Sequence, residues 1–151
     1  MSTLQTFRTL SNRDRVLLLE ATLWLTTASL AIAILPFPRI AGIASRKPLA
    51  ISPTSGKEDL VGRIRWAIAA ASSRVPWRAV CFQQGLAAHL MLRRRGINSV
   101  LYYGAAHTAD STLAAHVWVR ADDLDVVGCE EASKYALLAA FPGDAVRATP
   151  T

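Results

Sequence analysis

The first long run of apolar residues along the chain predicts a single helix that ends at Pro36. Ser11 lies three positions before Asp14, a spacing typical of a helix-opening capping box. Residues 21–35 carry no charge, but this run is shorter than the roughly 20 residues needed to cross a bilayer. We therefore expect a helix buried against the rest of the protein or a partner, with attachment to a membrane surface as the alternative.

The middle of the chain predicts a connector followed by two helices. Residues 45–57 are rich in proline, serine and glycine, which is typical of a linker. Ser55 and Glu58 have capping-box spacing and predict the start of a helix with sequence EDLVGRIRWAIAAAS. The next helix is expected over about residues 79–95 and should end at Gly96, because glycine suits the position after a helix.

The last third of the chain alternates in the manner of β-strands. NSVLYYGAA is rich in strand formers, and AAHVWVRA and DVVGCE flank the polar DDLD, which predicts a hairpin. The tail ASKYALLAAFPG fits either a short helix or an irregular segment. Helices followed by an antiparallel sheet indicate an α+β fold. The expected organisation is an apolar N-terminal helical segment at 1–44, a connector at 45–57 and a main domain at 58–151.

The net charge of +6 is distributed unevenly. Residues 1–47 have six basic and two acidic side chains, and residues 57–95 have eight and two. Residues 96–151 have three basic and seven acidic side chains. The basic stretches lack the glycine-aromatic pattern of an RNA-binding sheet, so nucleic acid is the weakest partner hypothesis. A basic face for an acidic peptide or an anionic membrane surface fits equally well.

Two cysteines, Cys81 and Cys129, do not make a disulfide framework, and their spacing indicates no metal site. The apolar run begins near residue 16 without a convincing cleavage site, so it does not resemble a secretion signal. We expect a cytoplasmic protein with reduced thiols and no cofactor.

Cys81 and His116 are the candidate catalytic pair. Cys81 opens a predicted helix, where the helix dipole and free N–H groups favour a thiolate and a developing oxyanion. His116 opens a predicted strand and would accept and return the proton. Taken singly, each residue is better explained by packing. Their combination in this helix and strand context makes the catalytic and structural explanations equal.

Three other residues of similar chemistry have simpler explanations. Cys129 lies in an apolar run and is expected to be structural. His89 falls two turns inside the Cys81 helix, where a packing or helix-surface role is expected. His107 lies in the loop AAHTADS and is expected to be solvated, although such a loop could line a cleft.

The segments PWRAVCFQQGLAAHLMLRRRGINSVLYYGA and AHVWVRADDLDVVG resemble the transglutaminase-like cysteine peptidase of lasso peptide biosynthesis. The resemblance is to the split form of this leader peptidase, covers roughly residues 58–142, and extends to its apolar N-terminal segment. It implies a papain-like or transglutaminase-like core with Cys81 as nucleophile and His116 as general base. It also implies a leader–core precursor as substrate, a small leader-recognition protein as partner, and a separate lasso cyclase acting on the freed core.

The family commonly has an acid about a dozen residues after the histidine, where this chain has Gly128. Hairpin geometry offers substitutes, because directly paired residues share a face. A two-residue loop at Asp122–Asp123 sets His116 opposite Cys129, a three-residue loop opposite Glu130, and a four-residue loop opposite Glu131. We favour Glu130, then Glu131. The aspartates, including Asp125, fit turn positions better.

Two tryptophans are the expected substrate contacts, Trp118 and Trp77. If the strand alternates, His116, Trp118 and Arg120 share one face, so the indole would shield the imidazole, although a purely structural Trp118 is equally compatible.

Two further hypotheses remain open: acyl transfer by the same residues, with an amine replacing water, and a non-catalytic scaffold on a membrane or in a biosynthetic complex. The arginines at 93–95 would either help dock an acidic partner or form a solvated helix end.

Overall fold

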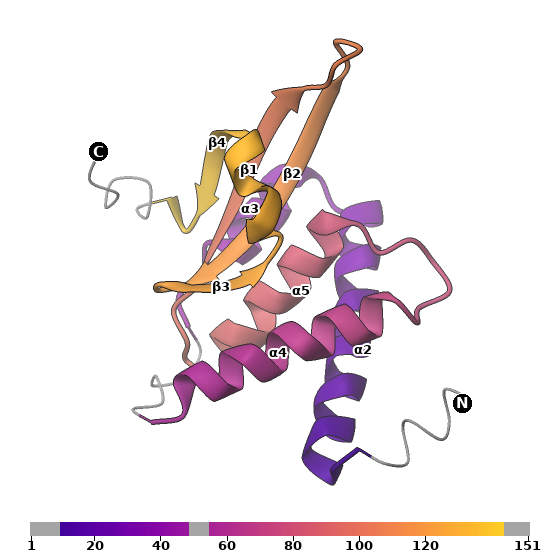
Figure 1. Cartoon of the computed structure of the whole chain (residues 1–151), viewed down its shortest axis with the longest axis vertical. Coiled ribbons are helices and arrows are strands. Elements are labelled where there is room, and N and C mark those ends of the chain that lie inside the picture. The colour runs from indigo at the N-terminus through magenta and orange to yellow at the C-terminus, as the bar shows by residue number, and fades with distance from the viewer. Residues whose placement is uncertain (1–9, 49–54, 144–151) are drawn as a thin grey trace.

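The computed structural model describes residues 10–48 and 55–143 and confirms the α+β fold. Helices come first in the chain and an antiparallel sheet follows (Figure 1). The elements are α2 (Asn12–Ile34), α3 (Phe37–Ala44), α4 (Lys57–Ser72), α5 (Cys81–Arg94), β1 (Val100–His107), β2 (Leu113–Ala121), β3 (Leu124–Val127), the 3₁₀ helix η1 (Cys129–Lys134) and β4 (Ala136–Phe141).

Helix α2 begins as the sequence predicts. The Ser11 hydroxyl accepts the Asp14 backbone N–H at 3.1 Å, which satisfies one of the free donors at the helix start. Arg63 of α4 donates to the Asp14 carboxylate at 2.8 Å and ties the two helices together. Hydrogen bonds from Ser11 and then Arg63 lower the pKa of Asp14.

The two sides of α2 differ. One side packs against α4 and α5 and buries Leu17, Leu18, Ala21, Leu25 and Ala28. The other side exposes a stripe of aliphatic side chains at helical spacing, namely Val16, Leu19, Leu23, Leu30 and Ile34. By length and a mean hydropathy of 1.8, α2 is also apolar enough to cross a membrane. The helix therefore belongs to the core on one side and presents an apolar surface on the other.

Helix α3 was not expected, because the sequence pattern ends the helical segment at the prolines. Pro36 is its N-cap and Pro38 lies within its first turn, where the missing N–H of proline has no cost. Phe37 then packs on Phe82, Tyr103 and Phe141, with ring centroids about 6 Å apart. These contacts join α3 to α5 and to the helix-facing side of the sheet.

Helix α4 starts differently from the prediction. Its N-cap is Gly56, with φ +73°, and no described side chain caps it, so the expected Ser55–Glu58 capping box is wrong.

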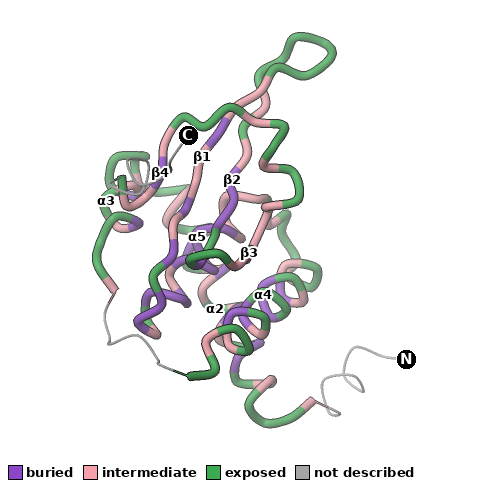
Figure 2. The backbone as a smooth tube through the Cα atoms, turned by 60° about the vertical axis from the view of Figure 1, so that its left-hand side comes forward, coloured by how far each residue is buried: buried purple, intermediate pink, exposed green. Residues whose placement is uncertain are grey.

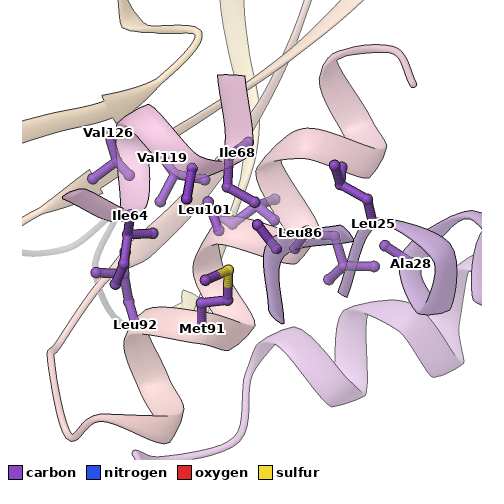
Figure 3. Close-up of a cluster of buried hydrophobic side chains, with 14 of the residues drawn as sticks. Leu25, Ala28, Ile64, Ile68, Leu86, Met91, Leu92, Leu101, Val119 and Val126 are labelled. Atoms are coloured by element: carbon purple, nitrogen blue, oxygen red, sulfur yellow. The ribbon is translucent and has the colours of Figure 1, made fainter. Parts of the chain in front are cut away.

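The hydrophobic core combines residues of the helices and the sheet (Figure 3). Its members include Leu25 of α2, Ile64 and Ile68 of α4, Leu86, Met91 and Leu92 of α5, and Leu101, Val119 and Val126 of the sheet. The core therefore lies between the three long helices and one face of the sheet.

The four strands have the order β3-β2-β1-β4, and all neighbouring pairs are antiparallel. The β1–β2 hairpin extends beyond the helices, and its tip is exposed (Figures 1 and 2). Part of the tail that was expected to be helical or irregular is strand β4, which pairs with β1. Since β3 and β4 lie at opposite edges, the chain between them crosses one face of the sheet as η1.

The arginines at the end of α5 bind within the protein. Arg93 is 5% exposed and donates to the carbonyls of Ile43 and Lys47 at 2.6 and 2.9 Å. Arg95 donates to Glu20 of α2 at 2.9 and 2.5 Å. Gly96 follows with φ +73°, as expected for a residue that ends a helix. Arg93 and Arg95 therefore fix the far end of α5 to α3 and α2.

Candidate active site

Cys81 is the first residue of α5 and is partly exposed. Its N-cap is Val80, and within the described chain no side chain caps this helix start. The first N–H groups of a helix have no partner inside the helix, so those of α5 remain available near the thiol. This confirms the predicted position of the cysteine at a helix start.

The loop that leads to Cys81 is held from two sides. Trp77, which is 36% exposed, donates from its indole N–H to the Ser29 hydroxyl of α2 at 3.0 Å. Gln84 donates to the Ala79 carbonyl at 2.8 Å and closes the turn immediately before the cysteine. Trp77, which the sequence analysis expects to contact substrate, therefore anchors the loop before Cys81 to α2.

His116 lies on β2 within a column of stacked rings. Its imidazole is 4.9 Å from the Tyr135 ring and 6.1 Å from the Trp118 indole, measured between centroids. Trp118 in turn stacks on Tyr102 of β1 at 5.6 Å and 14°. Trp118 is only 8% exposed, so most of its surface is used in this packing. The indole therefore covers the imidazole, as the strand alternation predicts.

The two faces of β2 carry different groups. A Cβ built on Gly85 of α5 would lie 2.6 Å from Val117 and 3.6 Å from Val119, so these valines face the helix. Because the β1–β2 register is regular there, His116 and Trp118 point to the opposite face, which η1 crosses. Among the hydrogen bonds of the described residues, none joins Cys81 to His116. The catalytic pair therefore stays a prediction.

The imidazole has one hydrogen-bond partner in the described structure, the backbone carbonyl of Gly128, 2.8 Å from Nε2. A carbonyl oxygen can only accept, so Nε2 carries the proton of the neutral ring. Gly128 is the position twelve residues after the histidine, where the resembled family has its acid. Here the backbone of that residue, rather than a side chain, contacts the ring.

The end of strand β3, rather than the hairpin register, explains why no paired strand places an acid opposite His116. The loop at Asp122–Asp123 has two residues, and a bulge between Val119 and Arg120 then shifts the pairing by one position. Strand β3 ends at Val127, and Gly128, with φ +72°, turns the chain into η1. The expectation that DVVGCE continues as a strand to residue 130 is wrong.

The three acids considered for orienting His116 all have basic partners. Glu130 is exposed and pairs with Arg65 of α4 at 2.7 Å. Asp125 accepts from Arg120 at 3.0 Å. Glu131 accepts from Lys134; this hydrogen bond is the largest cause that lowers the Glu131 pKa, and the charge of His116 contributes less. The structure therefore does not bring Glu130 to His116.

The remaining candidates have structural surroundings. The Cys129 thiol donates to the Val119 carbonyl at 3.2 Å, and burial raises its pKa. His89 is fully buried between the Ala44 carbonyl and the Ser99 hydroxyl, and burial lowers its pKa to about 4. His107 is exposed at the end of β1. Within residues 10–48 and 55–143, no group of three or more His, Cys, Asp or Glu is placed to hold a metal ion.

Comparison with protein families gives one match. A family model described as the transglutaminase-like superfamily matches residues 22–140, and the chain belongs to this superfamily. The superfamily includes both cysteine peptidases and transglutaminases. No curated protein and no solved structure matches the chain. The match starts inside α2, which agrees with the burial of one side of that helix in the core.

Sequence reasoning missed three groups: the Gly128 carbonyl and Tyr135, which contact His116, and Tyr102, which stacks on Trp118. Tyr102 could have been found from the cross-strand register, since it pairs directly with Trp118. Tyr135 and Gly128 approach the ring only because the chain leaves β3 and crosses the sheet. No local pattern in the sequence indicates that path.

Proposed function

We propose that this chain is a cysteine peptidase that removes the leader from a lasso peptide precursor. The observation that carries the proposal is Cys81, a partly exposed thiol at an uncapped helix start in a transglutaminase-like chain. The resemblance of its cysteine and histidine segments to the split leader peptidase supports the choice of substrate. The assignment of His116 as the base rests on the resemblance alone, because its side chain lies on the face of β2 opposite α5.

The proposed reaction proceeds through a thioester. His116 takes the proton from the Cys81 thiol, and the thiolate attacks the carbonyl that joins leader to core. The first N–H groups of α5 stabilise the developing oxyanion, and His116 returns its proton to the amine of the core. Water then hydrolyses the leader thioester, with His116 again as the base.

The proposed partners follow from the same resemblance. A small leader-recognition protein would deliver the precursor, and a separate cyclase would use the freed amine of the core, in the cytoplasm. Since Arg93 and Arg95 bind within the protein, an acidic partner would have to contact other basic residues. Exposed candidates are Arg39, which lies on α3, and Arg46, which follows the end of α3.

The test is a cleavage assay with the full-length chain, a lasso precursor and its leader-binding protein, followed by mass spectrometry. We expect free leader and free core from the native chain and none from Cys81→Ala. Cys129→Ala is the matched control, because its thiol bonds to backbone carbonyls, and it should still cleave. Cleavage by Cys81→Ala would refute the proposal.

A second candidate function is a non-catalytic or acyl-transferring scaffold that associates with a membrane or a biosynthetic complex. The exposed aliphatic stripe of α2 favours this candidate. Adding an amine acceptor to the cleavage assay separates the possibilities by mass. A leader bearing the amine indicates acyl transfer, and an unchanged precursor with a native complex indicates a scaffold.

A further inference from the structure

We propose that the Gly128 backbone carbonyl, rather than any acidic side chain, orients the His116 imidazole and leaves Nδ1 as its proton-accepting atom. The inference rests on the proposed function, because it takes His116 as the base of that reaction. Gly128 is thus a positioning residue that acts through the histidine.

The first argument is the hydrogen bond itself. The Nε2–O distance of 2.8 Å is that of a well-formed hydrogen bond, and the carbonyl can only accept. The neutral ring then has its proton on Nε2 and its lone pair on Nδ1. In histidines generally, the hydrogen bond made by one ring nitrogen determines whether the other nitrogen carries a proton.

The second argument is that the contact requires glycine. Gly128 has φ +72°, a conformation that residues with a Cβ rarely adopt. A Cβ at this position would lie 2.5 Å from the Val117 carbonyl oxygen and 3.1 Å from His116 Nε2. Any larger residue would therefore push the chain away from the ring and lengthen the hydrogen bond.

The third argument concerns the surroundings of the ring. Tyr135 and Trp118 stack near it and restrict its rotation. The carboxylates on η1 are engaged elsewhere, Glu130 with Arg65 and Glu131 with Lys134. The carbonyl is therefore the acceptor that contacts the ring, and it does not titrate.

The proposed reaction requires the Cys81 thiol to reach the imidazole, and its proton balance then closes with this tautomer. The S–H bond of Cys81 breaks and an N–H bond forms at Nδ1, while the Nε2–H bond to the carbonyl persists. The Nδ1 proton then passes to the leaving amine, which returns the ring to its starting tautomer. No group other than His116 has to gain or lose this proton.

The first experiment measures the tautomer directly. The full-length chain is labelled with ¹⁵N-histidine, and its ring nitrogens are observed by NMR at pH 8, with His116→Gln used to assign the signals. We expect a protonated Nε2 and an unprotonated Nδ1 for His116. A proton on Nδ1 in the native chain would overturn the inference, whatever the variants do.

The second experiment compares two glycine-to-alanine variants. Gly128→Ala and Gly56→Ala both place a Cβ at a left-handed position, but the Gly56 site has no atom within 4 Å of that Cβ. We measure the rate at which iodoacetamide alkylates Cys81 at pH 7. In Gly128→Ala we expect a fall of about tenfold, to the rate of His116→Gln, since a free thiol is mostly protonated at this pH. Gly56→Ala should retain the native rate.

The outcomes separate the two hypotheses. If Gly128→Ala reacts at the native rate, the inference fails while the peptidase proposal stands. If Cys81 in the native chain reacts like a free thiol and His116→Gln changes nothing, the proposed function fails, and the tautomer measurement still tests the Gly128 contact. If Gly128→Ala does not fold, the tautomer of the native chain decides.

Discussion

The helix layer and the outer face of the sheet each hold a histidine, and the two sites differ in how completely they bind it. His89 on α5 is fully buried and both of its nitrogens are bonded, to the Ala44 carbonyl and the Ser99 hydroxyl at 2.8 Å each. His116 on β2 is partly exposed, and within the described chain only its Nε2 has a hydrogen-bond partner. A ring with both nitrogens occupied is a structural element, whereas a ring with one free nitrogen can still exchange a proton.

The sharpest way to test this contrast is to remove the partly exposed histidine. In His116→Ala we expect the rate of precursor cleavage to fall by about 10²- to 10⁴-fold, because general base catalysis contributes this much. The midpoint of thermal unfolding should change far less than the activity, and circular dichroism checks this. A variant that cleaves at the native rate would show that the sheet-face histidine is structural too.

The buried histidine should instead control stability through pH. Its pKa is lowered from 6.5 to about 4 in the folded protein, mainly by burial, so only the unfolded chain takes up a proton between these values. The free energy of unfolding should therefore be unaffected by this group above pH 6.5 and decrease by about 3 kcal/mol as the pH falls to 4. Urea unfolding at several pH values measures the decrease.

The control for that experiment is His89→Gln, which does not titrate. Carboxylates such as Asp14, whose pKa is lowered, also destabilise the protein in acid, so the difference between the native chain and the variant is the informative quantity. Parallel pH curves for the two proteins would contradict the assignment of His89 as a buried neutral group.

A smaller change weakens the buried site without removing its ring. Ser99→Ala deletes the donor to His89 Nδ1 and leaves a buried acceptor without its partner. We expect a loss of about 1–2 kcal/mol in the free energy of unfolding, with cleavage activity unchanged. Ser72→Ala, at a half-buried serine whose hydroxyl bonds to its own helix, is the matched control and should change stability by much less.

The smallest expected effect on stability and cleavage is that of substituting Glu130, the acid favoured by the hairpin geometry in the sequence analysis. Glu130 is exposed and paired with Arg65, so Glu130→Gln should change the free energy of unfolding by about 0.5 kcal/mol or less. Its cleavage rate should stay within about twofold of the native rate, because the Gly128 carbonyl contacts the imidazole. A loss of activity comparable to that of His116→Ala would restore Glu130 as the orienting group.

The sequence predicted those parts of the site that depend on local pattern. Cys81 opens its helix, Gly96 follows the helix end, and His116 shares a strand face with Trp118, all as periodicity and capping indicate. The Ser11 cap is a further local signal that is confirmed.

What the sequence did not predict depends on contacts between distant segments. Strand β4 contains ALLAAF, which has no strand preference of its own and forms by pairing with β1. The environment of His116 depends on the end of β3 at Val127, after which Gly128 turns the chain across the sheet. Pro36 and Pro38 end one helix and also lie at the start of the next, α3. Because the sequence analysis took them only as an end signal, it did not predict α3.

Helix α2 has one side that is buried in the core and one exposed aliphatic side, and it is synthesised before the helices that cover it. The ribosome completes α2 well before it has made α4 and α5, the helices that cover its inner side. At ordinary synthesis rates the end of α5 follows the end of α2 by roughly 3–12 seconds. During this interval both sides of a 23-residue apolar helix lack their final neighbours. We therefore expect the nascent chain to expose this apolar surface to chaperones and membrane-targeting factors before the fold is complete.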